Sequence, residues 1–226
     1  MRRYRYPLWL LTGFWVCVVI AIGAVVRRLI ALTRAPSGGS SPLAVLDAAF
    51  DSHAALTLVH IVPAALFVIV AACVLLRRRA ENDWLETTFF VLGAVTGLTA
   101  YAMSRYAVGG WVERSAVLVF NTWFLLSLSR AYWFRFHGDG APKREWMTRA
   151  VAVLLGIATT RPVMGVFFAT SPRTHLSPHD FFGIAFWIGF SINAVAVEFW
   201  LRSKTRARLY DPEGSFQSGR RVGAVV

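Results

Sequence analysis

Charged residues are scarce in this chain of 226 residues, where they make up 16% of the composition and only 12 of them are acidic. A soluble domain usually has about 25% charged and about 45–50% apolar residues. The 56% apolar share excludes a water-soluble globule, and it equally excludes a disordered chain or a coiled coil. Cysteine is also rare. The two cysteines, Cys17 and Cys73, exclude a disulfide-rich secreted scaffold, and their different predicted depths argue against a disulfide between them.

The chain also lacks the short motifs of the common enzyme classes. It has no nucleophile elbow, zinc-protease motif, phosphate loop or dinucleotide fingerprint. We therefore predict no catalytic residues and do not expect an enzyme. The net charge of +12 does not indicate nucleic acid as a partner, because the basic residues form short clusters between apolar stretches rather than one soluble basic face.

What the sequence does contain is a series of long apolar stretches. A helix needs about 20 apolar residues to cross a hydrocarbon core of about 30 Å. Only helices satisfy their own backbone there, and the alternating pattern of a membrane barrel is absent. The sequence therefore predicts an all-α, polytopic membrane helix bundle with six transmembrane helices. They cover residues 7–26, 52–76, 84–105, 112–134, 146–170 and 179–201.

The distribution of lysine and arginine predicts the orientation of this bundle. With the N-terminus inside, the inner segments carry more than twice as many Lys and Arg residues as the outer ones. Both termini are then cytoplasmic, and the protein is a multi-pass protein of the bacterial inner membrane. Arg27 and Arg28 follow the first span directly, so we interpret that span as uncleaved. Residues 1–202 form the transmembrane domain, residues 33–41 an outer loop, and residues 203–226 a flexible basic cytoplasmic tail.

Polar residues within the spans gather at one predicted depth. His60, Asn121 and Arg161 lie about 12 to 14 Å below the outer helix ends, at 1.5 Å per residue. Tyr101 and Trp187 fall in the same layer. Because an ionisable group inside a membrane is costly, these five residues predict a polar pocket in the outer leaflet. The alternative is that helix carbonyls or snorkelling satisfy each of them locally.

Glycine and proline predict how the helices pack. Pro162 should kink the fifth span, and Gly165 should let a neighbouring helix approach. Gly93 and Gly97 form a G-x-x-x-G motif on the third span. Such a motif permits close contact within the protein, with another membrane subunit or with a second copy in a homo-oligomer.

A cofactor is possible at His60, although its identity cannot be read from the sequence. Haem b in a membrane bundle normally has two axial ligands on facing helices, with an arginine near the propionates. His60 and Arg161 suit such a site, but the only histidines near enough to be the second ligand are His53 and His179, at the rim. A quinone carbonyl bonded to His60 is the other redox interpretation.

The remaining polar groups receive structural interpretations. His175 and His179 have metal-ligand spacing, but the segment Ser177-Pro178-His179-Asp180 is typical of a helix N-cap, so no metal site is predicted. Glu198 lies deep in the last span, at the level of two basic residues. We expect an ion pair between Glu198 and either Arg130 or Arg149.

A family resemblance rests on several of these residues. The stretch Lys143-Arg144-Glu145-Trp146-Met147-Thr148-Arg149, running on to Arg161, resembles a bacterial membrane family, domain of unknown function 2306 (DUF2306). His60 matches the family's histidine in the second span. The last span resembles the family's final helix at Trp187, Asn193 and Glu198. The resemblance covers about residues 54–202 and implies a membrane protein without an established reaction.

Two departures from the family pattern concern histidines. The family has His-Arg-x-x-Gly before the third helix, where this chain has Glu81-Asn82-Asp83-Trp84. The histidine that opens the family's Trp-Met motif is Lys143 here. A site built from those histidines is therefore not expected in this chain.

These observations lead to three functional hypotheses. The first is a non-catalytic membrane subunit or a protein that binds a small amphipathic ligand, with Arg161 holding an anionic or carbonyl-bearing group. The second is a haem or quinone redox protein that uses His60. The third is a small-solute transporter that depends on Arg161.

Overall fold

The computed structural model describes residues 6–33, 52–76, 83–138 and 140–210, and within these ranges the fold is all-α. It contains six α-helices and one short 3-10 helix, and none of the described residues forms a strand. The predicted helix bundle is therefore confirmed. The elements are α1 (Leu8–Thr33), α3 (Ala54–Leu76), α4 (Asp83–Met103), η1 (Ser104–Tyr106), α5 (Gly110–Phe136), α6 (Gly140–Thr174) and α7 (Pro178–Tyr210).

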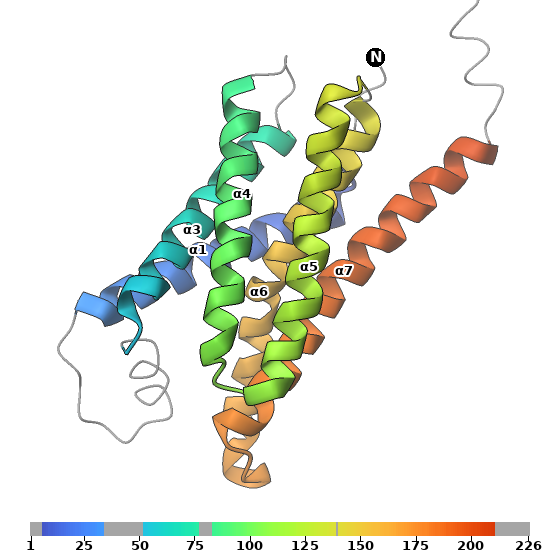
Figure 1. Cartoon of the computed structure of the whole chain (residues 1–226). Helices are drawn as coiled ribbons and strands as arrows, with labels where there is room; N and C mark the ends of the chain where they lie inside the picture. The colour runs from blue at the N-terminus through green and yellow to red at the C-terminus, as the bar shows by residue number, and fades with distance from the viewer. Residues whose placement is uncertain (1–5, 34–51, 77–82, 139, 211–226) are drawn as a thin grey trace, which may run out of the picture.

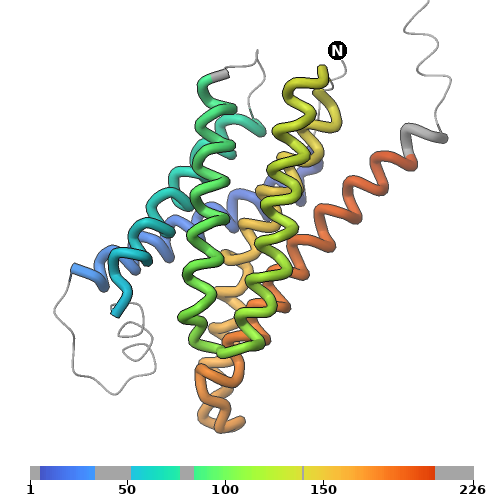
Figure 2. The backbone as a smooth tube through the Cα atoms, in the orientation of Figure 1, coloured from blue at the N-terminus to red at the C-terminus, as the bar shows by residue number. Residues whose placement is uncertain are grey.

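The helices α4, α5 and α6 form the middle of the bundle, and α1, α3 and α7 are inclined against them (Figure 1). The helix α1 crosses behind α3 at a steep angle, while the C-terminal part of α7 leans away from the others (Figure 2). The turn between α6 and α7 marks one end of the bundle, which we call the α6–α7 end. The ends of α4 and η1 and the start of α5 lie toward the same end (Figure 1).

Composition and length qualify five of the described helices as membrane spans: α1, α3, α4, α6 and α7. The helix α5 is long enough, but it carries several charged and amide side chains, including Glu113, Arg114, Asn121 and Arg130. It nevertheless runs alongside α4 and α6 through the bundle (Figure 1). The polar content of α5 is therefore the first sign of a polar interior.

Aromatic rings and glycines set the spacing of α3, α4 and α5. The buried Phe67 ring lies 4.7 Å from the ring of Phe89 and 5.7 Å from that of Phe124, measured between centroids. A Cβ atom at Gly93 would lie 2.9 Å from side-chain atoms of Leu128 and Phe67, and one at Gly97 would lie 2.5 Å from Leu125. The G-x-x-x-G motif thus serves close helix contact inside this chain.

Two helix ends differ from the sequence-based boundaries. The helix α1 continues to Thr33, so Arg27 and Arg28 lie on the helix and not in a loop after it. The helix α7 continues to Tyr210, so residues 203–210 of the predicted flexible tail are helical. No proline or glycine interrupts either extension, and a helix can continue beyond the hydrocarbon into the headgroup region. The remainder of the predicted tail, residues 211–226, and most of the predicted outer loop lie outside the described residues.

Ionic contacts join the helices at the end opposite to the α6–α7 end. The Lys143 ammonium on α6 lies 3.0 Å from the Glu86 carboxylate on α4, and both residues are buried. The neighbouring Arg144 donates a hydrogen bond to the carbonyl of Leu75 at the end of α3. We call these two contacts the α6 anchor, because they fix the start of α6 to α3 and α4.

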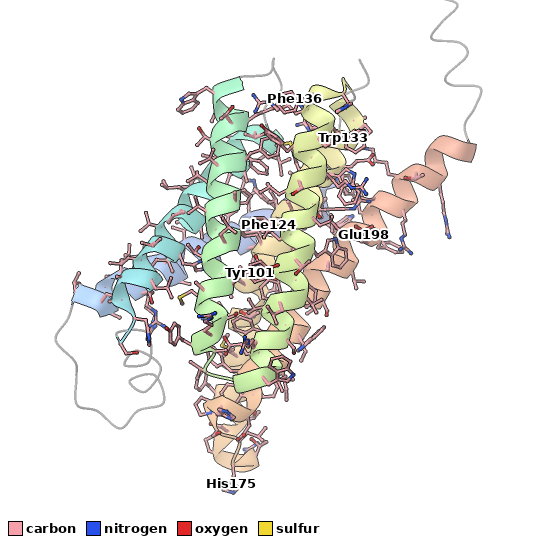
Figure 3. The ribbon with its side chains drawn as sticks, in the orientation of Figure 1. Tyr101, Phe124, Trp133, Phe136, His175 and Glu198 are labelled. Atoms are coloured by element: carbon pink, nitrogen blue, oxygen red, sulfur yellow. The ribbon has the colours of Figure 1, made fainter. Side chains whose placement is uncertain are left out.

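A second ion pair joins α6 and α7. The Arg149 guanidinium lies 2.5 Å from the Glu198 carboxylate, and its carbon lies 4.5 Å from the centroid of the Trp146 ring. Of the two predicted partners of Glu198, the structure selects Arg149, while Arg130 is exposed on α5. Figure 3 labels Glu198 on α7, away from the α6–α7 end, which His175 marks. The pair therefore stabilises helix packing and lies apart from the polar layer predicted around His60.

Candidate functional site

A cavity of about 450 Å³ lies within the bundle, toward the α6–α7 end, and all six described α-helices contribute to its wall. Its polar lining comes mainly from residues near that end, and its apolar lining continues toward the middle. Glu113 and Phe124 both line it and are three helical turns apart on α5, so the cavity is about 16 Å long. Figure 3 shows Phe124 between Phe136 and His175, nearer to Phe136. The length corresponds to one leaflet of a bilayer core of about 30 Å.

Phenylalanines dominate the apolar part of the wall. The rings of Phe120 and Phe190 stack with centroids 5.2 Å apart, and Phe186 lies 5.8 Å from Phe190 on α7. These rings close the side of the cavity formed by α5 and α7. They leave a surface that accepts hydrocarbon and offers no hydrogen bonds.

Arg161 is the charged residue at the centre of the α6 wall. It follows the fully buried Thr160, whose hydroxyl is held by the Ile157 carbonyl at 2.6 Å. Arg161 itself retains accessible surface and lines the cavity. Within the described part of the chain, it has no hydrogen bond and no ion pair. An arginine at this depth is expected to find acceptors, so its donors are available to a molecule in the cavity.

Three other charged residues share the cavity with Arg161, and none of them was predicted as a site residue. Arg27 and Arg28 on α1 are close enough to repel Arg161, whereas Glu113 on α5 attracts it without reaching ion-pair distance. Glu113 is buried, and its Oε2 accepts a hydrogen bond of 2.7 Å from the backbone N–H of Gly109. Arg161 is the cavity cation without a direct partner among the described residues, which favours an anionic occupant.

Sequence signals for these three residues were present. The uninterrupted stretch after Val26 allows the first helix to continue, which brings Arg27 and Arg28 onto the cavity wall. Glu113 stands in the first turn of its helix, where an acidic residue usually complements the helix dipole. Because this role alone accounts for an acidic residue there, the sequence offered no reason to place Glu113 beside the cavity.

His60 lines the cavity from α3. Its Nδ1 lies 2.9 Å from the Thr99 hydroxyl oxygen, and that hydroxyl donates to the Val95 carbonyl at 2.7 Å. Because the hydroxyl proton is already used, the Nδ1–H donates to Thr99 and carries the proton of the neutral ring. Nε2 is then the acceptor atom of the imidazole.

The other three predicted site residues do not all reach the cavity. Asn121 lines it and donates a hydrogen bond of 2.9 Å from Nδ2 to the Gly97 carbonyl. Tyr101 and Trp187 are not among the lining residues. The Tyr101 hydroxyl lies 2.7 Å from that of Thr122, and the Trp187 Nε1 donates to the Ser115 hydroxyl at 3.3 Å. The polar groups of Tyr101 and Trp187 thus form hydrogen bonds with hydroxyls of α5 and do not line the cavity.

The prediction for Gly165 is wrong. A Cβ atom at Gly165 would meet no atom within 4 Å, although the residue lines the cavity. No helix of the described chain packs closely there. The small residue leaves an open space one turn beyond Arg161 on the same face of α6.

The histidines near the α6–α7 end, His53 and His179, lie beside a stacked ring and a helix cap. The Asp180 Oδ2 accepts hydrogen bonds from the backbone N–H of Ser177 at 2.9 Å and from its hydroxyl at 2.6 Å, which is the predicted capping of α7. The His53 ring stacks on that of Tyr106 with centroids 3.7 Å apart. Among the described residues, which include all five histidines, no group of three or more metal-binding side chains occurs.

These positions do not fit a haem with two histidine ligands. His60 is the histidine that lines the cavity, whereas His53 is two turns away on the same helix and is not among the lining residues. Two ligands on one face of one helix cannot occupy opposite sides of an iron. The described residues therefore supply one histidine ligand at this cavity.

Comparison with known families agrees with the resemblance inferred from the sequence. A family model described as "Predicted membrane protein (DUF2306)" matches residues 57–201. A search of curated proteins and a search of solved structures found no match. The matched segment begins at α3 and ends within α7, so it contains most of the cavity wall, including His60 and Arg161. Because the match covers well over half of the chain, the protein belongs to the DUF2306 family of membrane proteins.

Proposed function

We propose that the protein is a non-catalytic membrane subunit or binding protein that holds an amphiphile with an anionic headgroup in the cavity. The headgroup lies at Arg161 and the hydrocarbon lies against the phenylalanines of α5 and α7. The observation that carries this proposal is the placement of Arg161, which lines the cavity without a partner among the described residues. An anion would satisfy its donors, and bidentate contact with a carboxylate or phosphate suits the planar guanidinium.

The shape of the cavity supports an amphiphile rather than a small soluble anion. A soluble anion needs a polar shell on all sides, whereas the inner part of this cavity is lined by aliphatic and aromatic side chains. The volume of about 450 Å³ is within the usual range for a site that holds a small molecule. The cavity length of about 16 Å matches an acyl chain that extends through one leaflet.

The predicted orientation adds a cellular location to this proposal. If the basic residues set both termini in the cytoplasm, the α6–α7 end faces the outside of a bacterial inner membrane. The headgroup is then held in the outer leaflet. Because Gly93 and Gly97 pack within the chain, a partner subunit or a second copy would have to dock on another face.

Mass spectrometry of molecules that co-purify with the protein tests the proposal. The protein is extracted in a mild detergent as wild type, as Arg161→Gln, as Arg161→Lys and as Arg130→Gln. Arg130 is the matched control, since it is an exposed arginine that does not line the cavity. We expect an anionic amphiphile in near-stoichiometric amount with the wild type and the control. The Arg161→Lys variant should keep a reduced amount, and Arg161→Gln should lose it.

Three results would overturn the proposal. Equal amounts of anionic amphiphile with Arg161→Gln and with wild type would show that the guanidinium does not hold it. A neutral quinone in place of an anion, lost on His60→Ala, would favour the redox interpretation. Solute flux into vesicles that is abolished by Arg161→Gln would favour the transporter.

A further inference from the structure

The helices α1 and α6 form adjacent parts of the cavity wall at the level of Arg161. The first half of α1 is held against α6, where the Tyr6 hydroxyl lies 3.3 Å from that of Thr148 and the Cys17 Sγ lies 3.6 Å from the Thr159 hydroxyl. Val18 is the buried residue of α1. Beyond it, the α1 residues that line the cavity include the small side chains Ala21 and Ala24.

The two helices diverge beyond this contact. In Figure 1 the C-terminal end of α1 lies to the left of the bundle, whereas the C-terminal end of α6 lies below its centre. The tube in Figure 2 shows the same separation. The cavity continues between them, because residues from both diverging segments line it and it is open to the outside.

Some residues of α6 are both exposed at the surface of the bundle and part of the cavity wall. Pro162, Val166 and Ala169 form part of an exposed stripe on this helix. Arg161 and Gly165, one turn apart, belong to the same exposed stripe and also line the cavity. Since Val166 is 64% exposed and apolar, this stripe suits contact with lipid chains. The opening beside Gly165 therefore faces sideways, into the bilayer.

We infer that the occupant is a membrane lipid with an anionic headgroup, and that it passes from the bilayer into the cavity sideways, between α1 and α6 past Gly165. This inference rests on the proposed function and adds the source of the ligand and its route. A lipid that moves sideways keeps its acyl chains among apolar groups throughout and brings its headgroup directly to Arg161. A water-soluble anion would instead have to arrive at the α6–α7 end, past Tyr106 and Arg27.

Gly165 is the residue that keeps this route open. A Cβ atom there would meet no atom within 4 Å, so a substituted side chain can leave the helix without displacing a neighbouring backbone. It would project into the opening and narrow the path. Gly23 on α1 is the matched control, because it is also exposed with no atom within 4 Å of its Cβ position, but it does not line the cavity.

The experiment measures lipid exchange on the protein in reconstituted vesicles. Protein in phosphatidylcholine vesicles with unlabelled phosphatidylglycerol is mixed with a donor population that carries deuterated phosphatidylglycerol. Native mass spectrometry then follows the labelled lipid on the protein over time. The variants are Gly165→Ala, Gly165→Leu and Gly165→Trp, with the same three substitutions at Gly23.

The expected result is a graded slowing of exchange that is confined to position 165. Gly165→Trp should slow exchange about tenfold or more, because the indole raises the barrier to passage, with Leu intermediate and Ala near wild type. All Gly23 variants should exchange at the wild-type rate. Soluble glycerol phosphate should not displace the bound lipid. The Ala and Leu variants keep the test valid if the tryptophan variant folds poorly.

Each contrary result has a distinct meaning. Equal exchange rates for the two series, with lipid still retained through Arg161, would overturn the sideways route and leave the proposed function intact. Displacement of the lipid by glycerol phosphate at a rate independent of residue 165 would do the same, and would favour access from water. A wild-type protein that retains no anionic lipid would overturn the proposed function and the route together.

Discussion

The contact between α6 and α7 beside Arg161 supports a quantitative prediction for Gly189→Ala. A Cβ atom at Gly189 would lie 2.6 Å from the backbone nitrogen of Thr160 and 2.8 Å from its Cα, whereas ordinary contacts are 3.4–4 Å. The two backbones would have to separate by about 0.8 Å, since neither is a flexible side chain that can turn aside. We expect a loss of about 1 to 3 kcal/mol in the free energy of unfolding.

The same substitution should reach the binding site. Thr160 is fully buried and is followed directly by Arg161, so a shift of the α6 backbone at Thr160 also moves the guanidinium. Gly189→Ala should therefore retain less anionic lipid than the wild type, although Gly189 is not among the residues that line the cavity. Thermal unfolding in detergent measures the first effect, and mass spectrometry of co-purified lipid measures the second.

Gly23→Ala is the control for this prediction. No atom lies within 4 Å of a Cβ at Gly23, and the helix propensity of alanine exceeds that of glycine by about 1 kcal/mol. Its stability should equal or slightly exceed that of the wild type. If Gly189→Ala unfolds at the same temperature as Gly23→Ala, the close approach of α6 and α7 is absent and the position of Arg161 derived from it is wrong.

Three further predictions concern named polar groups. Lys143→Met removes the ammonium that lies 3.0 Å from the buried Glu86 and leaves Arg135 as a cation 3.8 Å away, so it should destabilise the protein by about 1 to 3 kcal/mol in thermal unfolding, while the double variant with Glu86→Leu recovers most of that loss. Asp180→Ala removes the acceptor of two hydrogen bonds from Ser177, and it should cost about 1 kcal/mol by the same assay; no loss would argue against the cap. Arg161→Leu should stabilise the lipid-free protein by about 2.5 to 3.5 kcal/mol, because a charged side chain leaves the membrane interior. It should also abolish the stabilisation by added phosphatidylglycerol; destabilisation in both conditions would show that the guanidinium has a structural partner.

The sequence was sufficient to predict the six α-helices of the described residues, their approximate spans and a short choice of partners at equal depth. Apolar stretches have to match the bilayer thickness, so their positions follow from composition. The depth of Glu198, counted along the helices, left Arg130 and Arg149 as its two possible partners, and the structure pairs it with Arg149. The Ser177–Asp180 cap is local and follows from residues three apart.

The direction in which a side chain points around its helix could not be obtained by counting. Depth placed Tyr101 and Trp187 at the level of Asn121, but successive residues on a helix point about 100° apart. Asn121 therefore faces the cavity while its neighbour Thr122 bonds to Tyr101 outside it. Only the packing of the other helices determines which of these directions is the interior.

A small side chain was equally ambiguous. Gly97 and Gly165 both suggest a place where another helix comes close. The structure brings Leu125 against the first and nothing against the second. A glycine removes volume in either case, and the long-range arrangement decides whether a neighbour or a space takes it.

The α6 anchor has a consequence for motion in the bundle. Lys143 with Glu86 and Arg144 with the Leu75 carbonyl tie three helices together at one extremity, and the cavity lies toward the other. Helices that are held together at one end can separate at the other end while the contacts at the first end are kept. A ligand can thus enter or leave when α3 and α6 separate slightly at the cavity end, without breaking the contacts that hold their other ends, while α5 and α7 stay packed through Gly109 and Gly183.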